Sequence, residues 1–279
     1  MVEKLLIIAG AGDYPRLVIE GARRAGVSKV TVLAVKGSAS RRVVRSADEH
    51  HFICAGRADE AIELASSLGC DGAILAGQVS PMSLFTGKFS PRVRGWLSEM
   101  PVKNAHTIFG KLVEEMEKAG VKVLPASSYM DGAIPGEGVL TARGFTEHEQ
   151  SDIGRGIQVA QDVGRHDVGQ TVLVKSGMVL AVEAFEGTNA AIRRAGRLGK
   201  GSVLFKAARE GHDWRFDIPV VGLKTLKTMK SAGVTALGFQ AGRLILLDRE
   251  RVIEYANRHS IAIVGVDCSL PPAPLRPIG

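Results

Sequence analysis

The chain has 279 residues, of which 45% are hydrophobic and 23% are charged, and its formal net charge is +7. This length allows two ordinary domains with cores of their own, and the composition is that of a globular rather than a disordered protein. The positive charge fits an anionic ligand or contact with an anionic lipid surface. Nucleic acid is not expected as a partner, because no aromatic-basic motif accompanies the charge.

The cysteines and the apolar runs indicate a soluble protein of the cytoplasm. Cys54, Cys70 and Cys268 lie far apart and form neither a zinc pattern nor a disulfide framework, so a reducing compartment is expected. The apolar run near the N-terminus is too short for a signal peptide. No stretch approaches the roughly 20 apolar residues that a membrane helix needs.

The first half of the chain alternates strand and helix patterns. Apolar runs over 5–9, 30–35, 52–55, 72–77 and 121–125 predict strands, and the segments 16–25, 57–69 and 109–120 predict helices. This alternation is typical of an α/β domain with an open, mostly parallel sheet.

The glycine turn after the first strand only begins a dinucleotide fingerprint. Gly10 and Gly12 are present, but Arg16 does not supply the third glycine, and no acidic residue closes the second strand at Val35. The turn can offer backbone N–H groups to a phosphate or sugar, or it can be a structural turn. Gln78 follows the 72–77 strand at the carboxyl edge of the sheet, where it can bind a base or ribose. An NAD-dependent oxidoreductase is disfavoured.

Two further segments of this region carry expectations. The stretch 88–97 mixes basic and large apolar residues, which fits an acyl-chain-binding helix or a core-packed helix with a solvated basic face. The segment 129–138 is rich in glycine and is the predicted linker, with a domain boundary near residue 135. A disordered tail is expected from about residue 270.

The second half begins with a predicted helix over 147–164, which carries Asp152. Strand patterns over 168–175 and 178–184 flank Ser176-Gly177 and predict a β-hairpin. Gly187 and Thr188 then open a basic helix whose start suits a phosphate, although an ordinary helix cap explains them too. The strand over 202–207 carries Lys206.

The stretch from Asp213 to Asp217 places two carboxylates and an arginine at alternate positions. If this stretch is extended, Asp213, Arg215 and Asp217 project from one face and form an acid–base–acid row. Such a row suits a metal, a phosphate or a water to be activated, and an exposed strand edge with paired charges is the alternative. The polar residues of the second half fit phosphoryl transfer better than hydride transfer.

Several motifs resemble one known family. In chain order they are Leu6 to Gly12 with Tyr14-Pro15, Gly77-Gln78-Val79 with Pro81 and Leu84-Phe85, Ser151 to Gly154, Asp167 to Gln170, Ala181 to Thr188, and Asp213 to Gly222. Together they resemble the LpxI-type UDP-2,3-diacylglucosamine pyrophosphatases of lipid A synthesis. The match runs in order over nearly the whole chain, and the motifs of the second half are the specific ones.

The resemblance implies a Rossmann-like N-terminal domain over 1–134, joined to a family-specific α/β catalytic domain over 135–279. It implies Mg²⁺-dependent hydrolysis of UDP-2,3-diacylglucosamine, or a related lipid-linked nucleotide sugar, to UMP and 2,3-diacylglucosamine 1-phosphate (lipid X). Water activation by carboxylate and metal is expected. The resemblance also implies a cytoplasmic enzyme, transient contact with the inner membrane surface, and a homodimer.

The resemblance also assigns roles to single residues. Asp217 is the essential carboxylate, which activates water or holds the metal, and Asp213 and Arg215 complete the catalytic group. Asp213 and Asp217 are the expected metal ligands. The expected substrate-binding residues are Gly10, Gly12 and Gln78 on the uridine side, and Asp152, Gln170, Glu183, Glu186, Gly187, Thr188 and Lys206 in the rest of the pocket.

The chain departs from the family pattern at four positions. Asn104-Ala105 stands where the family has an acidic pair, Asn189 replaces an aspartate, and Val220 replaces a threonine. An amide in place of a carboxylate removes a metal ligand or a base but keeps hydrogen bonding. Two functions therefore stay open, the hydrolase and a non-catalytic protein of the same fold that binds a nucleotide sugar or lipid phosphate.

Overall fold

The structure is a computed structural model and describes residues 2–79 and 88–268. Ser80, Pro81, Leu84, Phe85 and the tail expected from about 270 lie outside the described residues. The chain divides into two compact units. The first comprises Met1–Asp131 together with Asp213–Asp217, and the second comprises Gly132–His212 and Ile218–Gly279. The segment Asp213–Asp217 thus folds with the first unit, whereas sequence analysis placed it in the C-terminal domain.

The first unit contains a sheet of four parallel strands in the order β3-β2-β1-β4. Its elements are β1 (Lys4–Ala9), α1 (Tyr14–Arg24), β2 (Lys29–Val35), α2 (Arg41–Ser46), β3 (Glu49–Ile53), the 3₁₀ turn η1 (Ala55–Arg57), α3 (Ala58–Ser67), β4 (Gly72–Ala76), α5 (Pro91–Glu99) and α6 (Ala105–Lys118). The predicted 121–125 strand is reduced to a single bridge between Val123 and Ala73.

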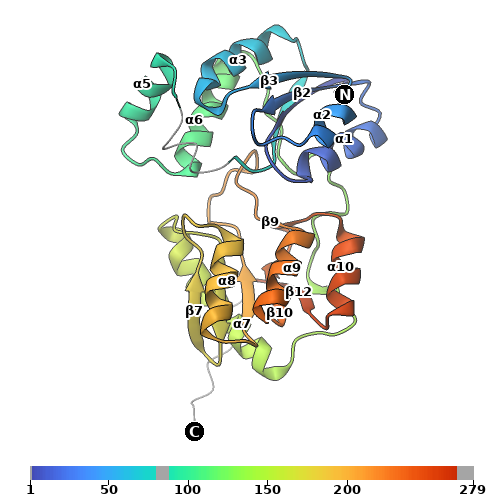
Figure 1. Cartoon of the computed structure of the whole chain (residues 1–279), viewed down its shortest axis with the longest axis vertical. Coiled ribbons are helices and arrows are strands. Elements are labelled where there is room, and N and C mark those ends of the chain that lie inside the picture. Colours follow the sequence, from blue (N-terminus) through green and yellow to red (C-terminus); the bar gives the residue numbers. More distant parts are fainter. Residues whose placement is uncertain (1, 80–87, 269–279) are drawn as a thin grey trace. The chain divides into compact units, whose positions relative to one another are not determined.

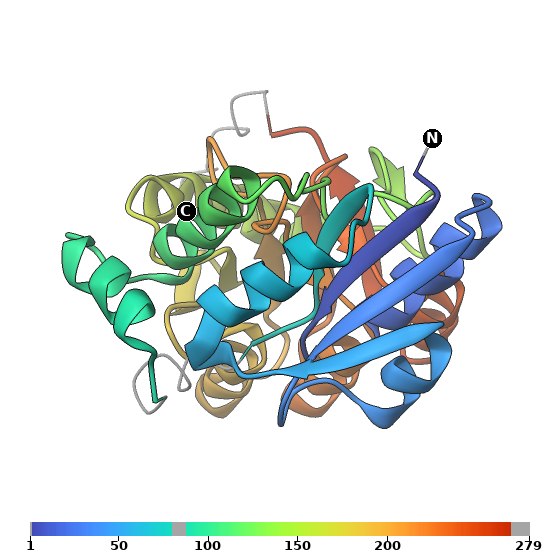
Figure 2. The ribbon, with the colours of Figure 1, turned by 90° about the horizontal axis from the view of Figure 1, so that it is seen from above.

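Helices cover both faces of this sheet. Side chains of β1, β2 and β4 pack with Ile62 and Ala65 of α3 and with Val113 and Met116 of α6. Figure 2 shows the strands β1 to β3 with α3 and α6 on one side and α1 and α2 on the other. The parallel strands bring their carboxyl ends to one edge, which is where ligands of such sheets bind.

The second unit contains a mixed sheet in the order β5-β12-β10-β8-β6-β7 and a small sheet of β9 and β11. Its elements are β5 (Gly138–Val139), α7 (Glu147–Arg165), β6 (Thr171–Lys175), β7 (Met178–Val182), α8 (Thr188–Leu198), β8 (Val203–Lys206), β9 (Val220–Val221), α9 (Leu223–Ala232), β10 (Ala236–Gln240), β11 (Ile245–Leu246), α10 (Arg249–Arg258) and β12 (Ala262–Val266). In Figure 1, α8, α9 and α10 stand side by side.

Alternation along the strands separates the two faces of the second sheet. Leu204 and Leu237 pack in one cluster with residues of α8, α9 and α10, whereas Val203 and Ala236 pack in another with residues of α7. The predicted hairpin is present, with Ser176 and Gly177 both at positive φ, as a tight two-residue turn requires. These features confirm the predicted α/β class with a mostly parallel first sheet and a second α/β domain.

The Asp213–Asp217 stretch is a turn, so it does not meet the condition of an extended strand under which the three side chains would form a row. The Asp213 carbonyl oxygen accepts hydrogen bonds from the backbone N–H groups of Phe216 (3.2 Å) and Asp217 (2.8 Å). The Asp213 carboxylate also accepts the backbone N–H of Arg215 at 2.9 Å. An aspartate that bonds its own backbone two residues on favours a turn over a strand.

Among the described residues, no helix combines the length and the apolar character needed to cross a membrane.

Candidate active site

The glycine turn and the loop after β4 meet at the carboxyl edge of the first sheet. Ala11 and Gln78 exchange two backbone hydrogen bonds, of 2.7 and 3.0 Å. Gly10 lies so close that a Cβ atom added to it would stand 2.5 Å from the Gln78 carbonyl oxygen. Gly10, Gly12 and Gln78 are therefore brought together, and Gly10 has a packing reason for being glycine.

The arginine of the Asp213–Asp217 turn binds the aspartate two residues before it. The Arg215 Nε atom lies 2.9 Å from Asp213 Oδ1, and its Nη2 atom lies 2.7 Å from Asp213 Oδ2. Arg215 Nη1 reaches Glu117 of α6 at 2.7 Å. The paired guanidinium lowers the pKa of Asp213 below its ordinary value. Arg215 thus ties the turn to α6.

Asp217 lies beside a histidine that sequence analysis did not single out. The distance from His106 Nδ1 to Asp217 Oδ2 is 3.6 Å, and the two side chains are 29% and 19% exposed. The His106 ring also lies 5.4 Å from the ring of Phe216, which stacks on Phe109 at 6.1 Å. His106 is in the first turn of α6, so Asp217 is held at the N-terminal end of that helix, where negative charge is stabilised.

Asn104, one of the departures, has a structural role at the start of the same helix. Its side chain accepts the backbone N–H of Thr107 at 2.8 Å, and the Thr107 hydroxyl faces the Asn104 N–H at 3.3 Å. This reciprocal pair is a capping box. Aspartate and asparagine cap helices about equally well, so the exchange leaves the start of α6 intact.

The two predicted metal ligands differ in how well they fit a metal ion. Both oxygens of Asp213 are engaged by the Arg215 guanidinium, which places a cation where the metal would bind. Within the described part of the chain, no three His, Cys, Asp or Glu side chains group as metal ligands. Mg²⁺ is commonly held by one or two carboxylates together with substrate phosphates, a role for which Asp217 fits and Asp213 does not.

A second cluster of predicted residues surrounds Lys206 in the second unit. Lys206 is 3% exposed, and its Nζ atom lies 3.0 Å from the hydroxyls of both Thr171 and Thr188 and 3.4 Å from Glu183. The Thr188 hydroxyl donates to Glu183 at 2.9 Å. Burial alone raises the pKa of Glu183, but Lys206 and the two threonine hydroxyls outweigh it and lower that pKa.

This cluster stands at the N-terminus of α8, which begins after Gly187 at a φ of +80°. Glu186 accepts a hydrogen bond from the backbone N–H of Ala184 and pairs with Arg194. The Asn189 Oδ1 atom is buried and has no hydrogen-bond partner among the described residues. A helix N-terminus next to a buried lysine is suited to bind a phosphate.

Two predicted substrate-binding residues, Asp152 and Gln170, form hydrogen bonds with the backbone of the second unit. The Asp152 carboxylate accepts the backbone N–H groups of Ser176 (2.9 Å) and Gly177 (2.7 Å), so it holds the hairpin turn. The Gln170 carbonyl oxygen accepts the Ala207 N–H at 3.0 Å, at the end of β8. The residues missed by sequence analysis are His106, Glu117 and Thr171. His106 and Glu117 lie in no motif, Thr171 directly follows the Asp167–Gln170 motif, and contacts identify all three.

Models of one protein family match nearly the whole chain. Residues 4–133 match the LpxI N-terminal domain, and residues 136–264 match the LpxI C-terminal domain. The UDP-2,3-diacylglucosamine pyrophosphatase LpxI of Caulobacter vibrioides is 30% identical over 95% of this chain and 98% of its own length.

Similarity to solved structures is much weaker. The biotin carboxylase domain of a thermophilic 2-oxoglutarate carboxylase is 13% identical at a TM-score of 0.29, over 62% of this chain and 35% of that chain. The biotin carboxylase subunit of pyruvate carboxylase is 16% identical at a TM-score of 0.29, over 67% of this chain and 39% of that chain. TM-scores this low do not establish a structural relationship. The matches to both LpxI domains and the similarity to the Caulobacter protein over nearly its full length show that the chain belongs to the LpxI family.

Proposed function

We propose that this protein hydrolyses the pyrophosphate bond of UDP-2,3-diacylglucosamine to UMP and 2,3-diacylglucosamine 1-phosphate. The name of the Caulobacter relative supports this substrate. The structural observation that carries the proposal is the turn from Asp213 to Asp217, which packs on α6 with Asp217 beside His106. A carboxylate fixed in this way is suited to take a proton from water or to bind a cation that neutralises phosphate.

In the proposed reaction, a water oxygen attacks one phosphorus atom and the bond from that phosphorus to the bridging oxygen breaks. Asp217 accepts the proton of the attacking water, or it holds the metal in the alternative assignment. Arg215, paired with both Asp213 and Glu117, keeps the turn on α6. Lys206 and the N-terminus of α8 are proposed, within the second unit, as a group that can bind a phosphate.

We propose Mg²⁺ as the cofactor, bound largely by the substrate's phosphates; in the alternative assignment Asp217 would be its protein carboxylate. Bound there, the ion would neutralise charge on the pyrophosphate. Asp213 is proposed to bind Arg215 and not the metal. Addition of EDTA to the purified protein tests this assignment: hydrolysis should stop and should return with Mg²⁺, and full activity in EDTA would remove the metal from the proposal.

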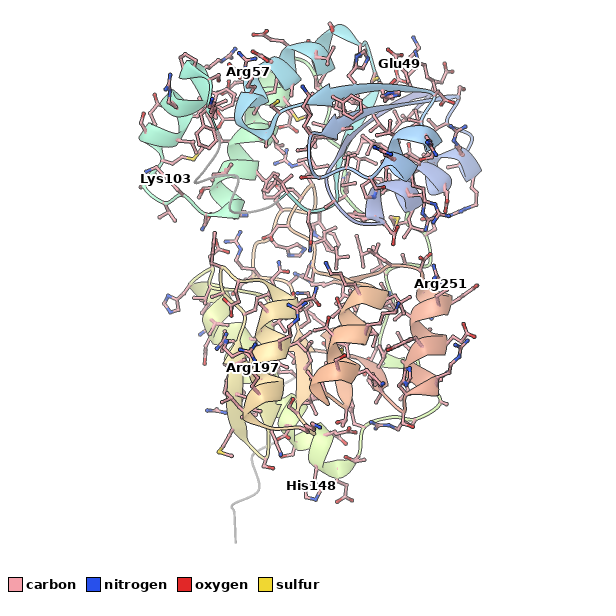
Figure 3. All side chains as sticks on the ribbon, viewed as in Figure 1. Glu49, Arg57, Lys103, His148, Arg197 and Arg251 are labelled. Carbon is pink, nitrogen blue, oxygen red and sulfur yellow. The ribbon has the colours of Figure 1, made fainter. Side chains whose placement is uncertain are left out.

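The enzyme is proposed to work in the cytoplasm as a homodimer and to touch the inner membrane surface transiently. The surface that fits membrane contact is a basic groove between α8 and α9, lined by Arg193, Arg197, Lys224, Lys227, Thr228 and Ser231. Neither α8 nor α9 contains an aspartate or a glutamate. Arg197, on α8, is labelled in Figure 3. Such a groove is complementary to anionic lipid headgroups.

Release of UMP from UDP-2,3-diacylglucosamine, measured for the native protein beside Asp217→Ala, tests the proposed function. We expect release by the native chain and a loss of about 10²-fold or more in the variant. Tight binding of the substrate without release would support the alternative, a non-catalytic protein that binds a nucleotide sugar or lipid phosphate. Equal release by both proteins would remove Asp217 from its role.

A further inference from the structure

The first unit contains an apolar pocket at the place where such sheets usually bind a nucleotide. Its cavity volume is about 120 Å³. The carboxyl ends of β1 to β4 form its floor, with side chains such as Ile8, Val35 and Leu75. Residues of α5 and α6, among them Trp96 and Phe109, form its walls.

The chemistry of the lining favours hydrocarbon over a base or a ribose. Among the described lining residues, the polar side-chain groups are the Cys54 thiol, the Trp96 indole N–H and the ammonium of Lys111. The ammonium is paired with Glu115 at 3.0 Å and Glu114 at 3.2 Å. A uracil base or a ribose in this pocket would lose hydrogen bonds to water without replacing them, at a cost of about 1–3 kcal/mol for each group. A hydrocarbon chain would gain about 0.8 kcal/mol for each CH₂ group buried.

The pocket and the Asp217 site share one helix. Ile108, Phe109 and Leu112 of α6 line the pocket, while His106, one turn earlier on α6, lies beside Asp217. Phe109 also stacks on Phe216 of the Asp213–Asp217 turn. A ligand whose phosphate lies at Asp217 can therefore extend an attached chain along the first turns of α6 into the pocket.

We propose that this pocket binds an acyl chain of the substrate. The proposal rests on the proposed function, because it identifies which part of the first unit recognises the lipid half of a diacylated nucleotide sugar. The uridine is then bound outside the pocket, at polar groups such as those around Gln78. The pocket sets a preference for long acyl chains, while short-chain substrates gain little from it.

Filling the pocket tests the proposal. Ala58 and Ala61 line it, and Ala58→Leu adds volume at the start of α3. We expect the ratio of kcat/KM for a long-chain substrate to that for a short-chain substrate to fall about tenfold or more. Ala25→Leu, at an exposed position of the same unit, should leave the ratio unchanged. Residual short-chain hydrolysis shows that the filled variant is folded.

A binding measurement separates this proposal from the hydrolysis itself. A fluorescent fatty acid should bind the native protein, be displaced by 2,3-diacylglucosamine 1-phosphate, and bind Ala58→Leu and Trp96→Ala at least about tenfold more weakly. That result supports the pocket even if the native chain releases no UMP. The proposal is overturned if hydrolysis proceeds and the chain-length ratio is the same in native and filled proteins. It is also overturned if the lipid fails to displace the probe.

Discussion

His106 Nδ1 lies 3.6 Å from Asp217 Oδ2, and this contact joins the two halves of the sequence at one point in the first unit. The distance is slightly long for a hydrogen bond, as catalytic contacts often are before substrate binds. The contact gives Asp217 a neighbour that can orient its carboxylate. It also places the candidate reaction at the start of α6, next to the apolar pocket.

We predict that His106→Ala lowers kcat for UMP release by about 10-fold to 100-fold and changes KM little, because the variant loses orientation of the carboxylate rather than substrate binding. His106→Asn should recover part of the rate, since the asparagine Nδ2 atom can stand near the position of Nδ1. His106→Gln should recover less. Steady-state kinetics with Mg²⁺ measure both constants.

His148→Ala is the matched control, because His148 is an exposed residue of α7 in the second unit (Figure 3). Its kcat should equal that of the native protein. If His106→Ala instead keeps the native kcat, or if all three substitutions act alike through a lower stability, the assigned role of His106 is wrong.

A second prediction concerns the bidentate ion pair between Arg215 and Asp213. Arg215→Lys keeps the charge but loses the bidentate geometry, so we expect kcat/KM to fall roughly tenfold or more. Glu117→Gln, which breaks only the partly exposed contact of Arg215 to α6, should have a much smaller effect. Comparable losses in the two variants would mean that attachment to α6, and not the geometry of the turn, is what matters.

Local patterns in the sequence were enough to predict most of the fold. Apolar runs and helical periodicity gave the α/β alternation, and Ser176-Gly177 predicted the hairpin because both residues of such a turn need positive φ. The position of Asp213–Asp217 could not be predicted in this way. Its attachment depends on Arg215 reaching Glu117 and on Phe216 packing on Phe109, which are contacts between distant segments. His106 has no local signal for the same reason.

A third prediction concerns the buried pair in the second unit. Lys206→Met leaves Glu183 buried beside the threonine hydroxyls without its cation, and should cost about 3–5 kcal/mol of unfolding free energy. The double variant Lys206→Met with Glu183→Gln should cost less than the sum of the two single variants, because it leaves no uncompensated charge. Urea unfolding of the four proteins measures the coupling.

Arg165→Met is the control for this cycle, because Arg165 forms an exposed ion pair with Asp162. The midpoint of urea unfolding of this variant should equal that of the native protein. Strictly additive costs at Lys206 and Glu183 would contradict the coupling that the structure implies.

A fourth prediction concerns pH. Glu149 is bound by Arg143, the Thr235 hydroxyl and the Thr146 N–H, which outweigh burial and lower its pKa from 4.5 to about 2. Because the folded pKa is the lower one, this stabilisation is present above pH 4.5 and is lost as the pH falls toward 2. Glu149→Gln should therefore cost about 1–3 kcal/mol at pH 7 and less at pH 3. Urea unfolding at the two pH values measures the difference.

Glu147→Gln, at an exposed position in the same first turn of α7, controls for removal of a charge near the helix N-terminus. It should have a small effect at both pH values. A cost for Glu149→Gln that stays constant from pH 7 to pH 3 would show that the carboxylate's charge does not supply the stabilisation.

The last prediction tests the membrane surface. Arg197→Glu combined with Lys227→Glu removes two cations from the groove between α8 and α9 and adds two acids. Each cation near an anionic bilayer contributes about 1 kcal/mol, so partition onto anionic vesicles should fall at least about 30-fold. Native binding should also weaken as salt is raised, because the contact is electrostatic. Cosedimentation with anionic and with zwitterionic vesicles measures the partition.

Arg251→Glu combined with Arg258→Glu makes the same change of charge on α10, where both arginines are 66% exposed. If this control reduces binding as much as the groove variant does, net charge rather than the groove governs membrane contact.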